Sequence, residues 1–146
     1  MDKQNVVIGG IYEYVYRHDI YIKLLVIDLN VENQPNRVKA IDADVAAKKL
    51  DANVLHADCL LFTKQVGFDA TYTDEYKQIQ DRIKTIQGYI DACNTLLGDK
   101  NKYYRYSTSH ERLEQWKRHY TQDIEDLTQG LESLKSTSWF KDSDNA

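Results

Sequence analysis

Apolar residues recur at alternating intervals of four and three from Tyr72 to Leu97, a spacing that forms one stripe on an α-helix. This stripe consists of Tyr72, Tyr76, Ile79, Ile83, Ile86, Ile90, Cys93 and Leu97. A second run repeats nearly the same spacing at Leu113, Trp116, Tyr120, Ile124, Leu127, Leu131 and Leu134. The pattern predicts two long helices packed antiparallel as a hairpin, with a heptad seam resembling that of a coiled coil.

Polar residues indicate where these helices begin and end. Thr71 to Glu75 supplies hydroxyls and carboxylates for the first free amides of the first helix, which ends at Gly98-Asp99. Thr108, followed three residues later by Glu111, matches a capping box at the start of the second helix. Because a helix from Tyr72 to Leu97 would be about 39 Å long, we expect the hairpin to project from the rest of the chain.

The residues before the hairpin follow a different pattern, with short β-branched and aromatic runs separated by turn residues. A short helix is expected from Asp44 to Leu50, with Asp42 or Asp44 near its start as a cap. Four or five short strands in this length favour a small closed or half-closed barrel, because curling the sheet removes exposed edges. The expected strands are Ile11–Tyr16, Ile20–Leu29, Arg37–Ile41 and Val54–Thr63, with a further piece at Gln65–Phe68.

Two aromatic residues follow the second helix. Ser136-Thr137-Ser138 breaks the helical pattern, and Trp139 and Phe140 come directly after it. Antiparallel packing would return both rings to the start of the first helix, where their apolar area would cap the barrel. The sequence therefore predicts an α+β fold, with the barrel over residues 1–68, the hairpin over 69–140 and a frayed tail over 141–146.

Composition narrows the class of protein. The apolar content of 42% is enough for a core, and the net charge of -4 argues against a generic nucleic-acid coat, which usually presents a basic surface. Cys59 and Cys93 are expected to be reduced core residues. With no leader and no membrane-length apolar run, we expect a cytoplasmic protein that does not engage a membrane. Eleven tyrosines and one proline would suit an AT-rich bacterial or phage genome.

A basic, tyrosine-rich stretch joins the two predicted helices within this acidic chain. Cations interleaved with aromatic rings are typical of protein-interface anchors, and also of surfaces that pair with phosphates and stack on bases. The remaining interpretation is a solvated loop whose tyrosines fold back on the hairpin. The predicted partner-binding residues are Lys102, Tyr103, Tyr104, Arg105, Tyr106, His110 and Arg112.

Catalytic and metal-binding signals are weak. His18, His56, His110 and His119 lack the paired spacing of a zinc site, so no metal or other cofactor is expected. His56 and Asp58 would share one face of a strand, either as an acid–base pair or as ordinary surface residues. Gly9-Gly10 indicates a turn or bulge rather than a phosphate-binding loop, and no nucleophile motif is present.

The order of apolar strands from Ile8 to Val66 resembles the SH3-like barrel of PemK/MazF-type endoribonuclease toxins. The resemblance implies an SH3-like barrel, but Ile22-Lys23 occupies the place of that family's arginine-proline pair. The family's catalytic serine or threonine would fall near Ala43-Asp44, which offers no hydroxyl. The resemblance therefore implies a similar barrel more than the same reaction. Residues to test for a relocated site are Arg17, His18 and His56.

These observations lead to two hypotheses from different classes. The first is a non-enzymatic protein-interaction module, such as an adaptor, an assembly factor or a phage-encoded inhibitor of a bacterial protein, that binds through the tip of the hairpin. The second is an RNA-binding or endoribonuclease-like toxin module built on the barrel. In either case the heptad seam is satisfied within one chain or by a homodimer through the helices.

Overall fold

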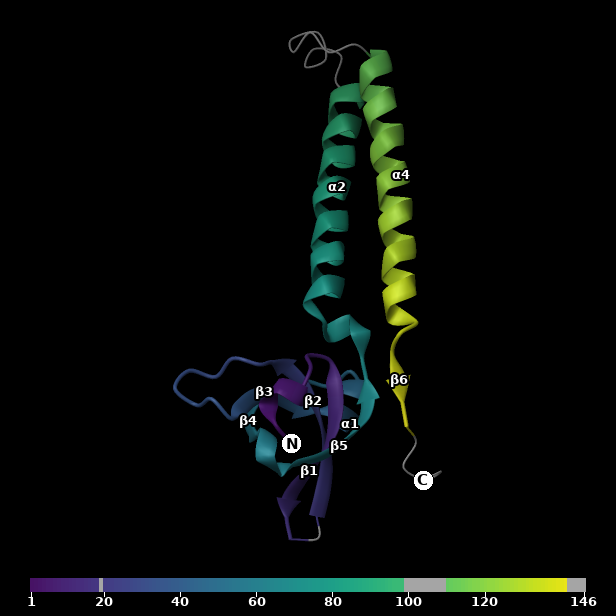
Figure 1. Ribbon diagram of the computed structural model, residues 1–146. Helices are drawn as coiled ribbons and strands as arrows, with labels where there is room; N and C mark the ends of the chain where they lie inside the picture. Colours follow the sequence, from purple (N-terminus) through teal and green to yellow (C-terminus); the bar gives the residue numbers. More distant parts are fainter. Residues whose placement is uncertain (19, 99–109, 142–146) are drawn as a thin grey trace. The chain divides into compact units, whose positions relative to one another are not determined.

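The computed structural model describes residues 1–18, 20–98 and 110–141, which form an α+β fold (Figure 1). Five strands precede two long helices that pack together, and a sixth strand after the helices completes one antiparallel sheet. The chain divides into two compact units. We call Met1–Asp74 together with the residues from Leu134 onward the sheet unit, and Glu75–Ser133 the hairpin unit.

All the strand pairs of the sheet are antiparallel, in the order β4-β3-β2-β1-β5-β6. Each strand before β6 agrees with an alternating or apolar run in the sequence. The strands are β1 (Gly10–Arg17), β2 (Ile20–Asp28), β3 (Arg37–Asp42), β4 (Leu55–Asp58), β5 (Phe62–Phe68) and β6 (Trp139–Phe140). Lys3–Asn5 forms a short 3-10 turn, η1, before β1.

Alternate side chains of the strands supply two separate apolar clusters, as the period of two predicts. One cluster contains Val6, Tyr12, Leu24, Val26, Val38, Ala40, Ala57, Cys59 and Phe62. The other contains Ile11, Leu25, Ile41, Ala43 and Val66, with Tyr72 packed against it. The sheet therefore has an apolar cluster on each of its faces.

Tyr12 lies in the centre of the first cluster. Its ring stacks on Phe62 with the centroids 5.1 Å apart, and its hydroxyl accepts a hydrogen bond of 2.9 Å from the Val7 N–H. Burial raises the pKa of the Tyr12 hydroxyl above its ordinary value of 10.0. A buried phenol that keeps its proton and its hydrogen-bond partner stabilises the sheet unit at neutral pH.

This raised pKa predicts a loss of stability in alkali. Above pH 10 the unfolded chain releases the Tyr12 proton while the native state retains it, so the free energy of unfolding falls by up to about 1.4 kcal/mol per pH unit from this group. At pH 8 the free energy of unfolding of Tyr12→Phe should be about 1 kcal/mol below that of wild type, because the Val7 N–H loses its acceptor. Between pH 8 and pH 10.5, however, the free energy of unfolding should fall less in Tyr12→Phe than in wild type. Urea unfolding at both pH values measures the difference, and equal losses in the two proteins would contradict the prediction.

The expected strand from Val54 to Thr63 is wrong, because a turn interrupts it. The Asp58 carboxylate accepts a hydrogen bond of 3.0 Å from the Leu60 N–H, and Cys59–Leu61 forms a 3-10 turn, η2. Asp58 thus ends β4 as a local cap. The chain then begins β5 at Phe62.

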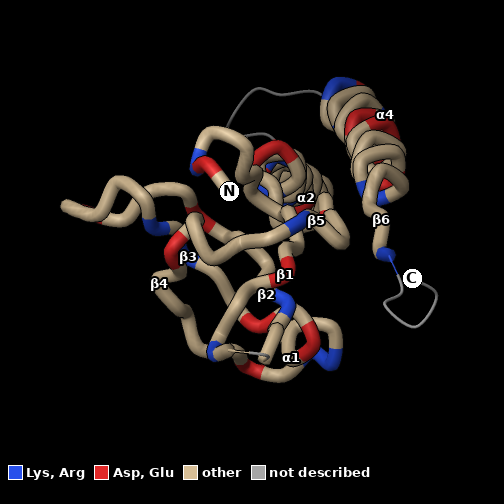
Figure 2. The backbone as a smooth tube through the Cα atoms, turned by 60° about the horizontal axis from the view of Figure 1, so that its bottom comes forward, with Lys and Arg blue, Asp and Glu red and all other residues tan. Residues whose placement is uncertain are grey.

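The short helix α1 (Ala43–Ala47) follows β3 directly. The Asp42 carboxylate caps it by accepting hydrogen bonds from the Asp44 and Val45 N–H groups, which confirms the first of the two predicted caps. Acidic residues lie at its start and two lysines follow its end (Figure 2), an arrangement that complements the helix dipole.

Trp139 and Phe140 join the sheet through their backbone. They form β6, in which Phe140 lies opposite Gly67 and Trp139 opposite Phe68. The prediction that these residues return to the N-terminal part of the chain is confirmed, but its expected mode is wrong, because they extend the sheet as a strand and both rings remain about half exposed. A two-residue run carries too little period to be recognised as a strand.

The helices are α2 (Asp74–Gly98) and α4 (His110–Lys135), preceded by a 3-10 turn, η3, at Ala70–Tyr72. Tyr72 therefore does not belong to the helical stripe, because the Asp69 carboxylate caps η3 and the Tyr72 side chain packs on the sheet unit. Among the described residues of the hairpin unit, the buried ones are Ile86, Ile90 and Cys93 of α2 and Leu113 of α4. The predicted capping residue Thr108 and the tail beyond Lys141 lie outside the described residues.

Candidate functional site

Of the seven predicted partner-binding residues, two lie within the part of the chain that the structure describes. Lys102, Tyr103, Tyr104, Arg105 and Tyr106 lie outside the described residues, whereas His110 and Arg112 lie in the first turn of α4. The His110 Nε2 is 3.7 Å from the Glu114 Oε1 one turn along the helix. Both His110 and Arg112 are exposed.

A cluster of aromatic side chains continues from Arg112 along α4. The Arg112 guanidinium lies 5.6 Å from the centre of the Trp116 ring, and Tyr120 follows one turn later. The Tyr120 ring lies 5.3 Å from that of Tyr89 on α2. We call Tyr89, Arg112, Trp116 and Tyr120 the hairpin aromatic cluster.

The exposure of this cluster differs from the sequence prediction. Trp116 was expected in the seam, yet it is 42% exposed, whereas Tyr120 is partly buried. Tyr89, which lies off the predicted stripe, is 44% exposed. Two helices cover only one side of each other, so a bulky ring near the seam keeps much of its surface in water. Tyr89 lies between Ile86 and Ile90, off the predicted stripe, so the sequence pattern did not predict its contact with Tyr120.

The structure does not bring together the residues considered for a relocated catalytic site. Arg17 and His18 are exposed at the β1–β2 end, where Arg17 lies over the Tyr16 ring at 5.4 Å. His56 is on β4 opposite Lys39, and Lys39 lies opposite Asp28 at the far end of β2. A strand of this length separates the two ends by roughly 25 Å.

The His56–Asp58 pair is engaged in local structure. The Asp58 carboxylate caps η2, and the His56 carbonyl accepts a hydrogen bond of 2.9 Å from Arg37 Nη1. The hydrogen bond at His56 involves its backbone alone, whereas the cap engages the Asp58 carboxylate, which favours the interpretation of ordinary surface residues over an acid–base pair.

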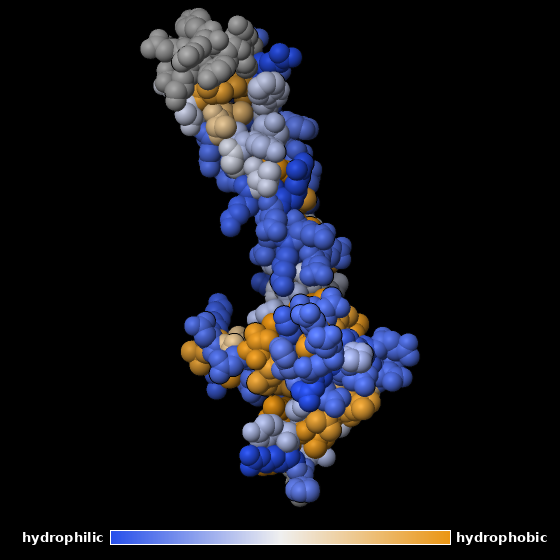
Figure 3. Space-filling view, turned by 90° about the vertical axis from the view of Figure 1, so that its left-hand side faces the viewer, coloured by the Kyte–Doolittle hydropathy of each residue, from blue (hydrophilic) through white to orange (hydrophobic). Residues whose placement is uncertain are grey.

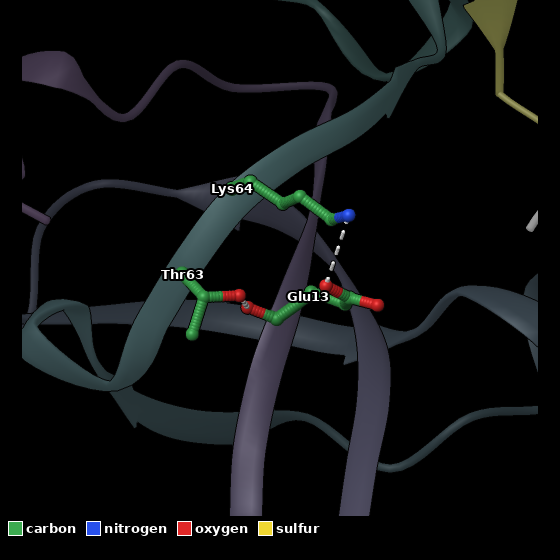
Figure 4. Close-up of polar contacts among 3 residues, drawn as sticks. All are labelled: Glu13, Thr63 and Lys64. Carbon is green, nitrogen blue, oxygen red and sulfur yellow. Dashed lines mark hydrogen bonds and ion pairs between the residues drawn. The ribbon is translucent and has the colours of Figure 1, made fainter. Parts of the chain in front are cut away.

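The polar groups between β1 and β5 also have a structural arrangement (Figure 4). Lys64 Nζ lies 3.8 Å from the Glu13 carboxylate, and the Thr63 hydroxyl donates to the Glu13 carbonyl at 3.4 Å. Both contacts link neighbouring strands, and the exposed ion pair contributes at most about 1 kcal/mol.

The cysteines are buried thiols. Cys59 and Cys93 are both free, which confirms the prediction of reduced core residues, and burial raises the pKa of each thiol. Lys117 opposes this effect at Cys93. Within residues 1–18, 20–98 and 110–141, no group of three histidine, cysteine, aspartate or glutamate side chains is placed to hold a metal ion.

A cavity of about 540 Å³ opens on the sheet unit. Its walls come from the second apolar cluster and from the elements around it, including Ile11, Leu25, Phe68, Tyr72, Trp139 and Phe140. In Figure 3, apolar side chains gather on the sheet unit, whereas the face of the hairpin unit seen there is mainly hydrophilic. Sequence reasoning missed the cavity because its walls depend on β6 and η3, neither of which it predicted.

Across the part of the chain that the structure describes, no helix is both long enough and apolar enough to span a bilayer. Comparison of the chain with protein-family models, curated proteins and solved structures gave no match.

Proposed function

We propose that the chain is a non-enzymatic protein-interaction module that binds its partner through the hairpin aromatic cluster and the adjoining basic tip. The observation that supports it best is the exposed Trp116 ring with Arg112 above it. Trp, Tyr and Arg are the residue types most enriched among binding hot spots, and half-exposed rings held by neighbours need little ordering when a partner covers them. An adaptor, an assembly factor or an inhibitor of a bacterial protein would each use such a surface.

Two details of architecture belong to this proposal. We infer that the sheet unit is an SH3-like barrel similar to that of the PemK/MazF-type toxins, because its short strands supply the side chains of two apolar clusters. We infer that the helices pack as a short antiparallel coiled coil, since the heptad stripe supplies all four buried residues described in the hairpin unit. A homodimer through the part-exposed remainder of this seam is compatible with the same stripe.

Removing one ring of the cluster should weaken partner binding strongly. Trp116→Ala and Tyr89→Ala are each expected to cost about 2 kcal/mol of binding, near thirtyfold, because the partner loses a large desolvated contact. The measurement is capture from nuclease-treated bacterial lysate, with the captured protein quantified by mass spectrometry and its affinity then measured by titration.

The matched control is Gln129→Ala, an exposed position on α4 outside the cluster, which should capture as wild type does. Circular dichroism verifies that every variant keeps its helices. Undiminished capture by both ring variants would refute the assignment of the cluster. Replacing Tyr103, Tyr104 and Tyr106 together with alanine tests the tip separately, and undiminished capture would remove the tip from the proposal.

A specific observation favours the second candidate, an RNA-binding module. Tyr16 and Tyr21 are 56% and 55% exposed at the β1–β2 end, and Arg17 lies over the Tyr16 ring. Exposed rings beside a cation are typical of single-strand stacking surfaces. If this candidate holds, a labelled single-stranded RNA should bind, should weaken steeply between about 50 and 200 mM salt, and should be lost in Tyr16→Ala. Protein capture that survives nuclease and tolerates this salt range would favour the first proposal.

A further inference from the structure

We propose that the sheet unit carries a second protein-binding site, at which an extended segment of a partner protein adds to the open edge of β6 and places an apolar side chain in the neighbouring cavity. This site is separate from the hairpin aromatic cluster. It neither requires nor excludes the function proposed for that cluster.

The cavity has the size and lining of a binding pocket. Its volume of about 540 Å³ lies within the range of roughly 300–1,000 Å³ usual for ligand sites, and its walls are mainly aliphatic and aromatic. Trp139 and Phe140 border it and are 47% and 56% exposed. Covering these rings would remove apolar surface from water, which is the main driving force of association.

Gly67 explains how Phe140 comes to line this cavity. A Cβ on Gly67 would lie 3.1 Å from the Phe140 ring and 3.1 Å from the Ile11 Cδ1. The missing side chain therefore leaves the space in which the Phe140 ring rests against the sheet. Because Ile11 belongs to the second apolar cluster, the Phe140 ring lies on the face that carries the cavity.

The backbone of β6 offers hydrogen-bonding groups beside the cavity. The Lys141 N–H donates to the Val66 carbonyl at 2.8 Å, so the N–H and carbonyl of Phe140, one residue earlier, point away from β5. Within the described residues β6 pairs only with β5, so this edge is open. An added strand would gain main-chain hydrogen bonds from the edge and specificity from a side chain in the pocket. The other open edge, β4, contributes no residue to the cavity.

The polar groups of the lining favour a peptide over a purely aliphatic ligand. Asp69 is engaged with Thr71, and Ser138 Oγ accepts from the Ala70 N–H at 2.8 Å. The Lys135 ammonium and the Asp44 carboxylate have no partner among the described residues and lie in the same lining. A peptide carries charges of both signs and backbone dipoles that can use these two groups, whereas a hydrocarbon ligand uses neither.

The test uses the full chain and four fluorescein-labelled heptapeptides of the pattern Lys-X-Thr-X-Thr-X-Glu, with X being isoleucine, valine, leucine or phenylalanine. Fluorescence anisotropy measures binding. At least one peptide should bind, and a version N-methylated at its central residues should bind about tenfold more weakly, because it lacks donors for the edge. Absence of binding by all four peptides up to about 1 mM would overturn the proposal.

Two matched pairs of variants locate the binding. Ala47→Trp fills the cavity from an exposed lining position and should weaken binding about tenfold, whereas Ala92→Trp, exposed on α2, should leave it unchanged. Phe140→Pro removes the outward N–H without removing a bond to β5, so it should bind several-fold more weakly than Phe140→Ala. Equal affinities within either pair would overturn the site.

The hairpin proposal can fail without affecting this result. Trp116→Ala should bind the peptides as wild type does, since its ring belongs to the hairpin unit and the cavity is lined by the sheet unit. A loss of peptide binding in Trp116→Ala would contradict the separation of the two sites.

Discussion

Leu113→Ala is expected to destabilise the hairpin unit by about 2 to 5 kcal/mol, the usual cost of emptying a fully buried leucine site. Leu113 is the one residue of α4 that is fully buried, with 0% of its side chain exposed. Truncation of Leu113 to alanine leaves a cavity in the seam. Few other side chains of the seam are buried, so few neighbouring side chains can shift to fill this cavity. Thermal unfolding followed by circular dichroism at the helical band measures the loss.

Leu127→Ala is the matched control on the same helix. Leu127 is only partly buried, so the same deletion should cost less than half as much. Leu113 also neighbours Arg112 and lies one turn before Trp116, so Leu113→Ala should reduce partner capture as well as stability. Equal destabilisation by the two alanines would show that the seam continues into an interface that buries Leu127, as in a homodimer through the helices.

The helical hairpin was the most predictable part of this fold. A heptad stripe of seven or eight residues constrains helix type, length and facing surface at once, so α2 and α4 follow the sequence closely. The ends were less predictable. Tyr72 fits the stripe by spacing, but Asp69 captures the Thr71 N–H and begins a 3-10 turn before the helix can start.

The sheet was predictable only where strands alternate over several residues. β1, β2 and β3 follow their apolar runs. η2 interrupts a run that reads as continuous, because the Asp58 side chain caps the Leu60 N–H locally, and a period-two pattern does not register such a contact. The sixth strand depends on pairing between Phe68 and Trp139, which are distant in sequence. No local pattern encodes such a contact.

The candidate sites show the same division. The basic tip and Arg112 can be recognised from the residue types in the sequence. The exposure of Trp116 and the Tyr89–Tyr120 contact depend instead on how the two helices pack against each other. The cavity requires seven elements, β1, β2, α1, β5, η3, the end of α4 and β6, and a glycine in their correct places. A sequence can therefore indicate which residue types are available for binding, while the surface that they form follows from packing.

Gly9→Ala is expected to destabilise the sheet unit by about 2 to 4 kcal/mol, although it adds only one methyl group. Gly9 has φ of 88°, in the region that disfavours a Cβ, and an added Cβ would lie 2.6 Å from the Asp69 carbonyl oxygen. That oxygen cannot move freely, because the Asp69 N–H donates to the Gly9 carbonyl at 2.8 Å and the Gly9 N–H donates to the Val26 carbonyl at 2.8 Å. The methyl group would have to break one of these links between β1, β2 and the segment leading to α2.

Gly88→Ala is the matched control, because the same substitution is expected to increase stability at that position. Gly88 lies in α2 with nothing within 4 Å of an added Cβ, so alanine there should stabilise the hairpin unit by about 1 kcal/mol through helix propensity. The same chemical change is thus expected to act in opposite directions at two glycines of one chain. Urea unfolding of the two variants in a Trp116→Phe background, where Trp139 is the one remaining tryptophan, reports the sheet unit by fluorescence, and circular dichroism reports the helices. A Gly9→Ala protein as stable as wild type would mean that the turn at Gly9 relaxes without loss, and that the links from Gly9 to Val26 and Asp69 contribute little to the fold.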